Sequence, residues 1–158
     1  MIETNWGGTI VEAWSTPEGL NSCDIAPNDD NPPNANSYLF NAMINPLLKN
    51  TIYGALWYQG NTAESTIFAL TDYLCITGEA NAGWNRDQYG CTFTTMINDW
   101  RKLWNQHSGS NPNFPFGFVQ LATNQPNDYY IGTPMVRYYQ TNGYGFVPNE
   151  VMEVSNHP

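Results

Sequence analysis

The longest helical pattern in the chain covers residues 86–106, and it restricts the possible folds more than any other feature. Large apolar side chains recur there at intervals of three and four residues, which places them on one face of an α-helix. They are Tyr89, Phe93, Met96, Ile97, Trp100 and Trp104. Because an isolated helix gains little stability without packing of its apolar face, we expect these side chains to lie in the core.

Three short segments are predicted as strands. Residues 51–58, TIYGALWY, are largely apolar and lack strict alternation, as expected for a buried parallel strand. Residues 116–121 are a second candidate, and residues 2–5 have the character of a strand end. These strands would supply the sheet against which the long helix packs.

Two further helices are predicted, over residues 37–48 and residues 133–140. The apolar face of the first consists of Leu39, Met43 and Leu47. That helix should distort or end near Pro46, because proline removes a backbone donor. The resulting order of strand, helix, strand, helix and strand favours an α/β fold, with a parallel sheet flanked by helices.

Charge and aromatic content limit the class of ligand. The chain has 158 residues, enough for one domain, with 14 acidic and 5 basic side chains and a net charge of −9. Nucleic acids and anionic membrane surfaces are disfavoured as partners, because their phosphates would be repelled. Aromatic residues form 15% of the chain, which suits stacking on sugar rings as well as ordinary core packing. A neutral or sugar-like ligand fits best, and no apolar run approaches the roughly 20 residues that span a bilayer.

Residues 6–14, WGGTIVEAW, combine a glycine turn with the predicted start of a helix. Thr9 and Glu12 have the spacing of a capping box, in which each side chain accepts from the other residue's backbone N–H. A strand end, Gly7 and Gly8, and a helix N-terminus would then follow one another. Such a turn presents N–H groups at the positive end of a helix dipole, where they can hold an anion or a developing oxyanion.

Residues 17–36 are predicted to form an acidic surface loop. They contain several prolines, the Asp29-Asp30 pair and few apolar positions. A calcium loop is disfavoured here, because the regular ligand spacing and closing glutamate of an EF-hand are lacking.

One phrase of the sequence becomes continuous when residues 61–78 are set aside. Residues 57–60, WYQG, then join residues 79–93, EANAGWNRDQYGCTF. The joined phrase resembles the WYQGE block of the sialate O-acetylesterase family, carbohydrate esterases of the SGNH-hydrolase type. WGGTIVEAW, LFNAMINPLL and FPFGFVQL resemble further blocks of that family in the same order. The resemblance implies a three-layer α/β fold, incomplete at both ends, with residues 1–158 as one partial esterase domain.

The chemistry that this resemblance implies is serine-based acyl transfer on an acetylated sialic acid, with no cofactor and no metal. A serine attacks the acetyl ester, a histidine takes the serine proton, and amide donors hold the oxyanion. Gly7 or Gly8 matches the glycine block that offers an oxyanion-hole N–H. Gln59 and Gly60 match the block that lines the same hole. Glu79 matches a glutamate that orients a partner side chain or contacts the sugar.

Two catalytic residues of the family have no match in residues 1–158. The nucleophilic serine lies in a GQSN block upstream of the glycine block. The base lies in a late DxxH block, for which His157 is the nearest candidate, with Val154 where the aspartate would stand. His107 is predicted to be a solvated histidine at the end of the long helix. We therefore expect this chain alone to be inactive. No signal segment marks its Met1 end, and the resemblance implies a lysosomal or secreted protein.

Residues 61–78 interrupt the matched phrase as an atypical insert, and three explanations fit them: a real surface loop, an added helix or strand, or translated non-coding sequence. The last is favoured, because codons at both edges can contain splice signals and eighteen codons keep the reading frame. Cys75 falls inside this segment, which leaves Cys23 and Cys91 as a disulfide or as two free buried thiols. No CxxC or His-rich spacing supports a zinc site.

Two other functions stay open. Related esterases deacetylate xylan with a similar glycine block and QGE, although LFNAMINPLL and YGCTF favour the sialate group. A non-catalytic sugar-binding protein is the other, with Trp6, Trp14 or Trp57 stacking on a sugar face. Trp6 and Trp57 are also the predicted substrate contacts of an esterase.

Overall fold

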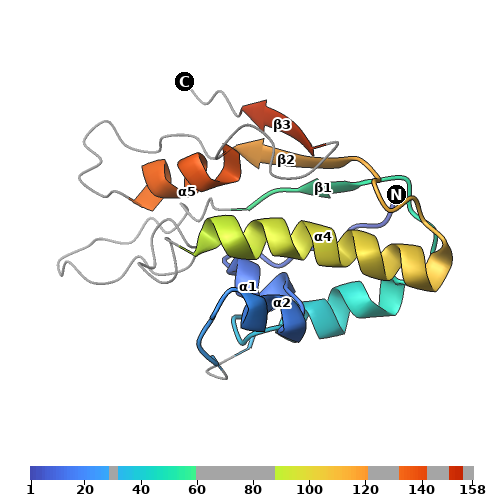
Figure 1. Ribbon diagram of the computed structural model, residues 1–158, viewed down its shortest axis with the longest axis horizontal. Coiled ribbons are helices and arrows are strands. Elements are labelled where there is room, and N and C mark those ends of the chain that lie inside the picture. The colour runs from blue at the N-terminus through green and yellow to red at the C-terminus, as the bar shows by residue number, and fades with distance from the viewer. Residues whose placement is uncertain (29–31, 60–87, 121–131, 142–149, 155–158) are drawn as a thin grey trace.

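The computed structural model describes residues 1–28, 32–59, 88–120, 132–141 and 150–154. Figure 1 shows a parallel sheet in these residues, with the long helix α4 beside it and several shorter helical segments. The predicted α/β class with a parallel sheet is therefore confirmed.

The sheet has the strand order β1 (Ala55–Trp57), β2 (Phe116–Gln120) and β3 (Glu150–Val154). Both neighbouring pairs are parallel, with Ala55 opposite Phe116 and Phe116 opposite Glu150. The predictions of strands within residues 51–58 and 116–121 are confirmed. The strand expected at residues 2–5 is wrong, because those residues form no ladder in the described structure, and β3 supplies the third strand instead.

Helix α4 (Tyr89–Ser108) covers one face of the sheet (Figure 1). All six of its predicted core residues are buried, which confirms the periodicity argument. Phe93 packs edge-on against Phe116 and Phe118 of β2, with ring centroids 6.1 and 5.5 Å apart. The helix ends at Gly109, whose φ of +70° is left-handed and whose N–H donates to the Asn105 carbonyl.

Among the described residues, none covers the other sheet face at Leu56 of β1. Trp57 points into the core with 8% of its surface exposed, whereas the neighbouring Leu56 is 91% exposed. Successive strand residues point to opposite faces, so this contrast separates a covered face from an uncovered one. The expectation of a fully buried strand over residues 51–58 is therefore wrong on one face.

Two short helices, α1 (Val11–Trp14) and α2 (Pro17–Ser22), pack against α4 and lie below it in Figure 1. The capping box predicted for Thr9 and Glu12 is wrong. Helix α1 starts two residues after Thr9, its N-cap is Ile10, and no side chain caps it.

Helix α2 corrects the expectation of an irregular loop over all of residues 17–36. It begins with Pro17 at a position where proline is tolerated, because the first helical N–H needs no intrahelical acceptor. The Thr16 hydroxyl caps the helix by accepting from the Gly19 N–H at 2.9 Å, and it donates to the Asp99 carboxylate of α4. A local cap and a contact with α4 thus stabilise a segment whose composition suggests a loop.

The helix predicted over residues 37–48 is present in a distorted form. A π-helical turn, η1 (Phe40–Ile44), passes into a 3₁₀ turn, η2 (Asn45–Leu47), which contains Pro46. The expected distortion at that proline is confirmed. The predicted helix near the end of the chain is also confirmed, as α5 (Gly132–Thr141).

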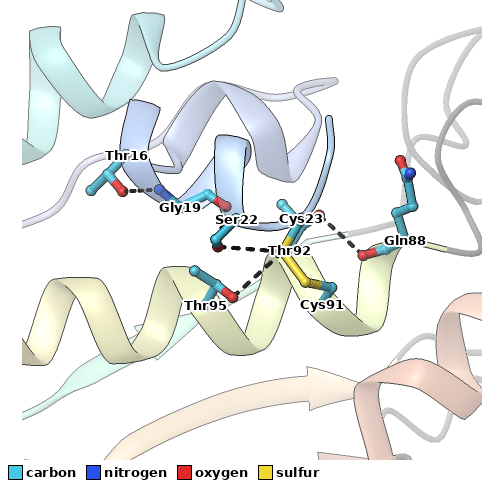
Figure 2. The surroundings of a disulfide bond; sticks show 8 residues. All are labelled: Thr16, Gly19, Ser22, Cys23, Gln88, Cys91, Thr92 and Thr95. Atoms are coloured by element: carbon cyan, nitrogen blue, oxygen red, sulfur yellow. Dashed lines mark hydrogen bonds between the residues drawn. A yellow bond between two sulfur atoms is a disulfide. The ribbon is translucent and has the colours of Figure 1, made fainter. Parts of the chain in front are cut away.

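Cys23 and Cys91 form a disulfide that joins the end of α2 to the first turn of α4 (Figure 2). Their Cα atoms lie 5.8 Å apart, within the ordinary range for such a bond. Of the two alternatives left open for these cysteines, the disulfide is therefore the one adopted. Cys75 and the insert at residues 61–78 lie outside the described residues.

Candidate functional site

The Gln59 side chain occupies a buried position just beyond the carboxyl end of β1. Its Oε1 accepts from the Trp57 indole Nε1 at 3.3 Å and from the Tyr89 hydroxyl at 3.0 Å. Its Nε2 donates to the Thr9 carbonyl at 3.2 Å. The amide group of Gln59 therefore joins three segments: strand β1, the first turn of α4 and the N-terminal segment. Only 8% of the Gln59 surface is exposed.

These contacts determine which way the Gln59 amide faces. An indole N–H can only donate, so the group opposite Trp57 must be the amide oxygen. The amide nitrogen then faces the Thr9 carbonyl, on the side of the two glycines. This orientation follows from the chemistry of the three partners and directs an N–H donor toward the glycine turn, residues 6–9.

The glycine turn is shaped by Gly8, whose φ of +77° lies in the left-handed region that favours glycine. Gly7 is open to its surroundings, since no heavy atom would lie within 4 Å of a Cβ added there. The Thr9 hydroxyl closes the turn by donating to the Trp6 carbonyl at 2.8 Å, and it accepts from the Trp14 indole at 2.9 Å. These contacts explain why Thr9 does not serve as a helix cap.

Asn34 holds the same turn from the opposite direction. Its Oδ1 accepts from the Ile10 N–H at 3.1 Å, and its Nδ2 lies 3.4 Å from the Gly8 carbonyl. Sequence reasoning missed this residue, because it lies more than twenty positions away in the segment expected to be a loop. The only available signal was the general tendency of asparagine amides to bind backbone groups.

Gln120 lies at the carboxyl end of β2, next to β1. The register pairs Trp57 with Phe118, so Gln59 and Gln120 each stand two residues beyond that pair. Gln120 is also buried, and its Nε2 lies 3.5 Å from the Arg137 carbonyl of α5. The carboxyl edge of the sheet, where ligand sites of open parallel sheets form, thus carries two buried amides.

Comparison with known proteins now identifies the relatives of this chain. No family model matches it. The sialate O-acetylesterase of Homo sapiens is 36% identical over 163 aligned residues, which cover 96% of this chain and 27% of that protein. The sialate O-acetylesterase of Mus musculus is 31% identical over 189 residues, with coverage of 96% and 31%. The chain is therefore homologous to part of these sialate O-acetylesterases.

A solved structure supports the fold of this chain. The crystal structure of a carbohydrate acetylesterase from Xanthomonas citri superposes with a TM-score of 0.64 at 24% identity. The match covers 94% of this chain and 28% of the bacterial one. The chain therefore spans less than a third of the length of each of these relatives.

The structure brings together three of the residues predicted for the sialate O-acetylesterase site, namely Gly7, Gly8 and Gln59. Trp6 is 52% exposed beside them, so its ring is available for stacking. Gly60, Glu79 and His157 lie outside the described residues. His107 is exposed in the last turn of α4, as expected of a solvated histidine.

Trp57 has a different place from the one predicted for a substrate contact. Its ring packs edge-on against Trp14 and Trp100, with centroids 5.8 and 5.7 Å apart. Trp14 itself is only 4% exposed. Because both rings are enclosed by the core, the expectation that either stacks on a sugar is wrong for this conformation. Trp57 acts on the site through its indole N–H, which contacts Gln59.

Across the residues that the structure describes, no group of three or more His, Cys, Asp or Glu side chains is placed to hold a metal ion. Nor does any helix among them have the length and apolar character needed to cross a membrane.

Proposed function

We propose that this chain forms the oxyanion-stabilising part of a sialate O-acetylesterase-like hydrolase that removes O-acetyl groups from sialic acids. The observation that carries the proposal is the buried Gln59 amide, whose nitrogen faces the glycine turn at the carboxyl edge of a parallel sheet. The homology to sialate O-acetylesterases supports the reaction class. We also propose the three-layer SGNH-hydrolase arrangement for the domain.

The reaction is acyl transfer in two steps. A serine oxygen bonds to the acetyl carbon while a histidine takes its proton, and the carbonyl oxygen becomes negative. Collapse of this intermediate breaks the bond to the sugar oxygen, which leaves as a hydroxyl after taking the proton from the histidine, and water then attacks the acetyl-serine and releases acetate by the same route. The resemblance assigns the serine and the histidine to blocks absent from residues 1–158, so this chain supplies the side of the site that receives the negative charge.

Gln59 and the backbone N–H groups of Gly7 and Gly8 are the proposed donors to that oxyanion. Donors that are already oriented stabilise developing charge without reorganising during the reaction. Gln59 meets this condition, because its side chain is held by partners from three segments. Gly60 would line the same hole, and Glu79 would orient a partner side chain or contact the sugar.

Trp6 is the proposed sugar contact. It belongs to the glycine turn, it is about half exposed, and an aromatic face next to the reacting ester would hold the sugar ring. The origin of residues 61–78 as translated non-coding sequence stays a prediction. If translated, the insert separates Gln59 from Glu79 and would disturb their relative positions.

Acetylated xylan is a second candidate substrate, because the net charge of −9 favours a neutral ligand over an anionic sialic acid. The rates of acetate release from acetylated sialic acid and from acetylated xylan, measured at low and moderate ionic strength, decide between these two candidate substrates. The protein to use is the product of the complete transcript that encodes residues 1–158. Preference for acetylated sialic acid supports the first proposal, and preference for xylan replaces it.

Gln59→Ala tests the proposed site in that protein. Loss of one oxyanion donor lowers kcat by about 10²- to 10³-fold. Gln106→Ala is the matched control, since Gln106 is an exposed glutamine of α4. Unchanged kcat in Gln59→Ala would refute the role given to this amide. Sugar binding without acetate release would favour the non-catalytic protein.

A further inference from the structure

We infer that Tyr89 is a positioning residue for Gln59, and that its hydroxyl keeps the Gln59 amide aimed at the glycine turn. The catalytic purpose of this orientation rests on the proposed function, in which the amide is an oxyanion donor. The contact itself rests on the geometry: the Tyr89 hydroxyl donates to the Gln59 Oε1 at 3.0 Å. Neither composition nor spacing assigned Tyr89 any role beyond the core.

The Tyr89 hydroxyl lies closer to the amide oxygen than the Trp57 indole does. The Trp57 indole lies 3.3 Å from the same oxygen, near the long end of hydrogen-bond distances. The terminal torsion of a glutamine side chain has a broad energy profile, so its partners set its orientation. Two donors on the oxygen and the Thr9 carbonyl on the nitrogen define one plane for the amide. Without the hydroxyl, the amide oxygen loses the shorter of these two contacts.

Tyr89 is itself held firmly, which a positioning residue requires. The residue is 1% exposed, and its ring stacks on Phe93 one turn along α4, at 5.4 Å and an interplanar angle of 18°. Cys91 follows two residues later and ties the same turn to Cys23 (Figure 2). The hydroxyl thus comes from a helix turn fixed by both ring packing and a covalent bond, so it can orient a more adaptable side chain.

Tyr89→Phe removes the hydroxyl while keeping the packed ring. Its effect on a catalytic site should appear in kcat rather than in KM, because the amide is proposed to act on the charge of the transition state. The loss of one net hydrogen bond corresponds to about a 5- to 10-fold decrease in kcat. Tyr53→Phe is the matched control, because Tyr53 is 91% exposed.

The decisive experiment observes the amide directly in the ¹⁵N-labelled 158-residue chain. The Gln59 side-chain NH₂ signals are identified by their loss in Gln59→Ala. In Tyr89→Phe we expect these signals to shift and the proton that faces Thr9 to exchange faster with solvent. Tyr53→Phe should leave them in place.

A second control separates positioning from a general loss of stability. Trp104→Phe removes another part-buried donor, the indole N–H that contacts the Asn50 carbonyl at 3.1 Å, away from Gln59. It should destabilise the chain and leave the Gln59 signals unchanged. Unchanged Gln59 signals in Tyr89→Phe, or equal changes in Trp104→Phe, would overturn the inference.

The two readouts distinguish failure of this inference from failure of the proposed function. The amide signals need no substrate, so they test positioning whatever the protein catalyses. A moved amide with unchanged kcat in the complete enzyme upholds the positioning role and refutes Gln59 as an oxyanion donor. An unmoved amide refutes the positioning role even if the enzyme is an esterase.

Discussion

The disulfide between Cys23 and Cys91 should contribute a large share of the stability of this chain. Its two cysteines are 68 positions apart, so reduction lets a long loop open in the unfolded state. The chain-entropy relation for a loop of that length gives about 15 cal/mol/K, or about 4.4 kcal/mol at 25 °C. Since whole domains are stable by only about 5 to 15 kcal/mol, a loss of this size is readily measured.

The perturbation is the double variant Cys23→Ala/Cys91→Ala, compared with the oxidised parent chain. Urea unfolding followed by the fluorescence of the six tryptophans gives the free energy of unfolding of each. We expect the variant to be less stable by about 4 kcal/mol, and the reduced parent chain to fall by a similar amount.

Cys75→Ala is the control, because it removes the third cysteine without touching this bond. Its free energy of unfolding should fall much less than that of the double variant, because the Cys23–Cys91 bond stays intact. The reasoning is refuted if the double variant keeps the parent stability to within about 1 kcal/mol under conditions where unfolding is two-state. An equal loss in Cys75→Ala would assign the effect to a different pairing.

Three further substitutions test contacts of α2, of α4 and of the glycine turn. Thr16→Ala removes the cap on the Gly19 N–H and should cost about 1 to 2 kcal/mol in urea unfolding, whereas the exposed Thr51→Ala should cost little. Arg101→Met removes two hydrogen bonds from a buried guanidinium to the Phe114 carbonyl and should cost about 2 to 3 kcal/mol by the same assay; the exposed Lys102→Met is its control. Asn34→Ala should speed hydrogen exchange at the glycine turn while exchange in α4 stays at its parent rate, and equal acceleration in both would contradict a local role.

Local patterns predicted the elements whose stability depends on a repeating apolar face. The six large residues of α4 follow helical spacing from Tyr89 to Trp104, so one face had to be buried, and it is. Strand β3 was missed, because its sequence, EVMEV, carries two charged side chains and lacks the apolar run that marks β1 and its surroundings. Residues 2–5 show the opposite error, since strand-like composition does not supply a pairing partner.

Side-chain spacing was a poor guide wherever distant groups compete for the same atoms. Thr9 and Glu12 have capping-box spacing, yet the Thr9 hydroxyl is used by Trp6 and Trp14. Trp57 was expected at a sugar, but aromatic neighbours from other elements enclose it. A tryptophan on a short strand can serve either purpose, and only the packing of the helices around it decides which.

The sequence by itself determined that this chain is an α/β domain related to sialate O-acetylesterases, because helical periodicity and ordered motifs are carried by neighbouring residues. The tertiary structure decided how the candidate site is held. Gln59 is oriented by Tyr89, thirty positions away, and by Thr9, fifty positions away, and Asn34 secures the glycine turn from a third segment. Hydrogen bonds between segments so distant form only after the sheet and α4 have packed, so no local pattern could predict them.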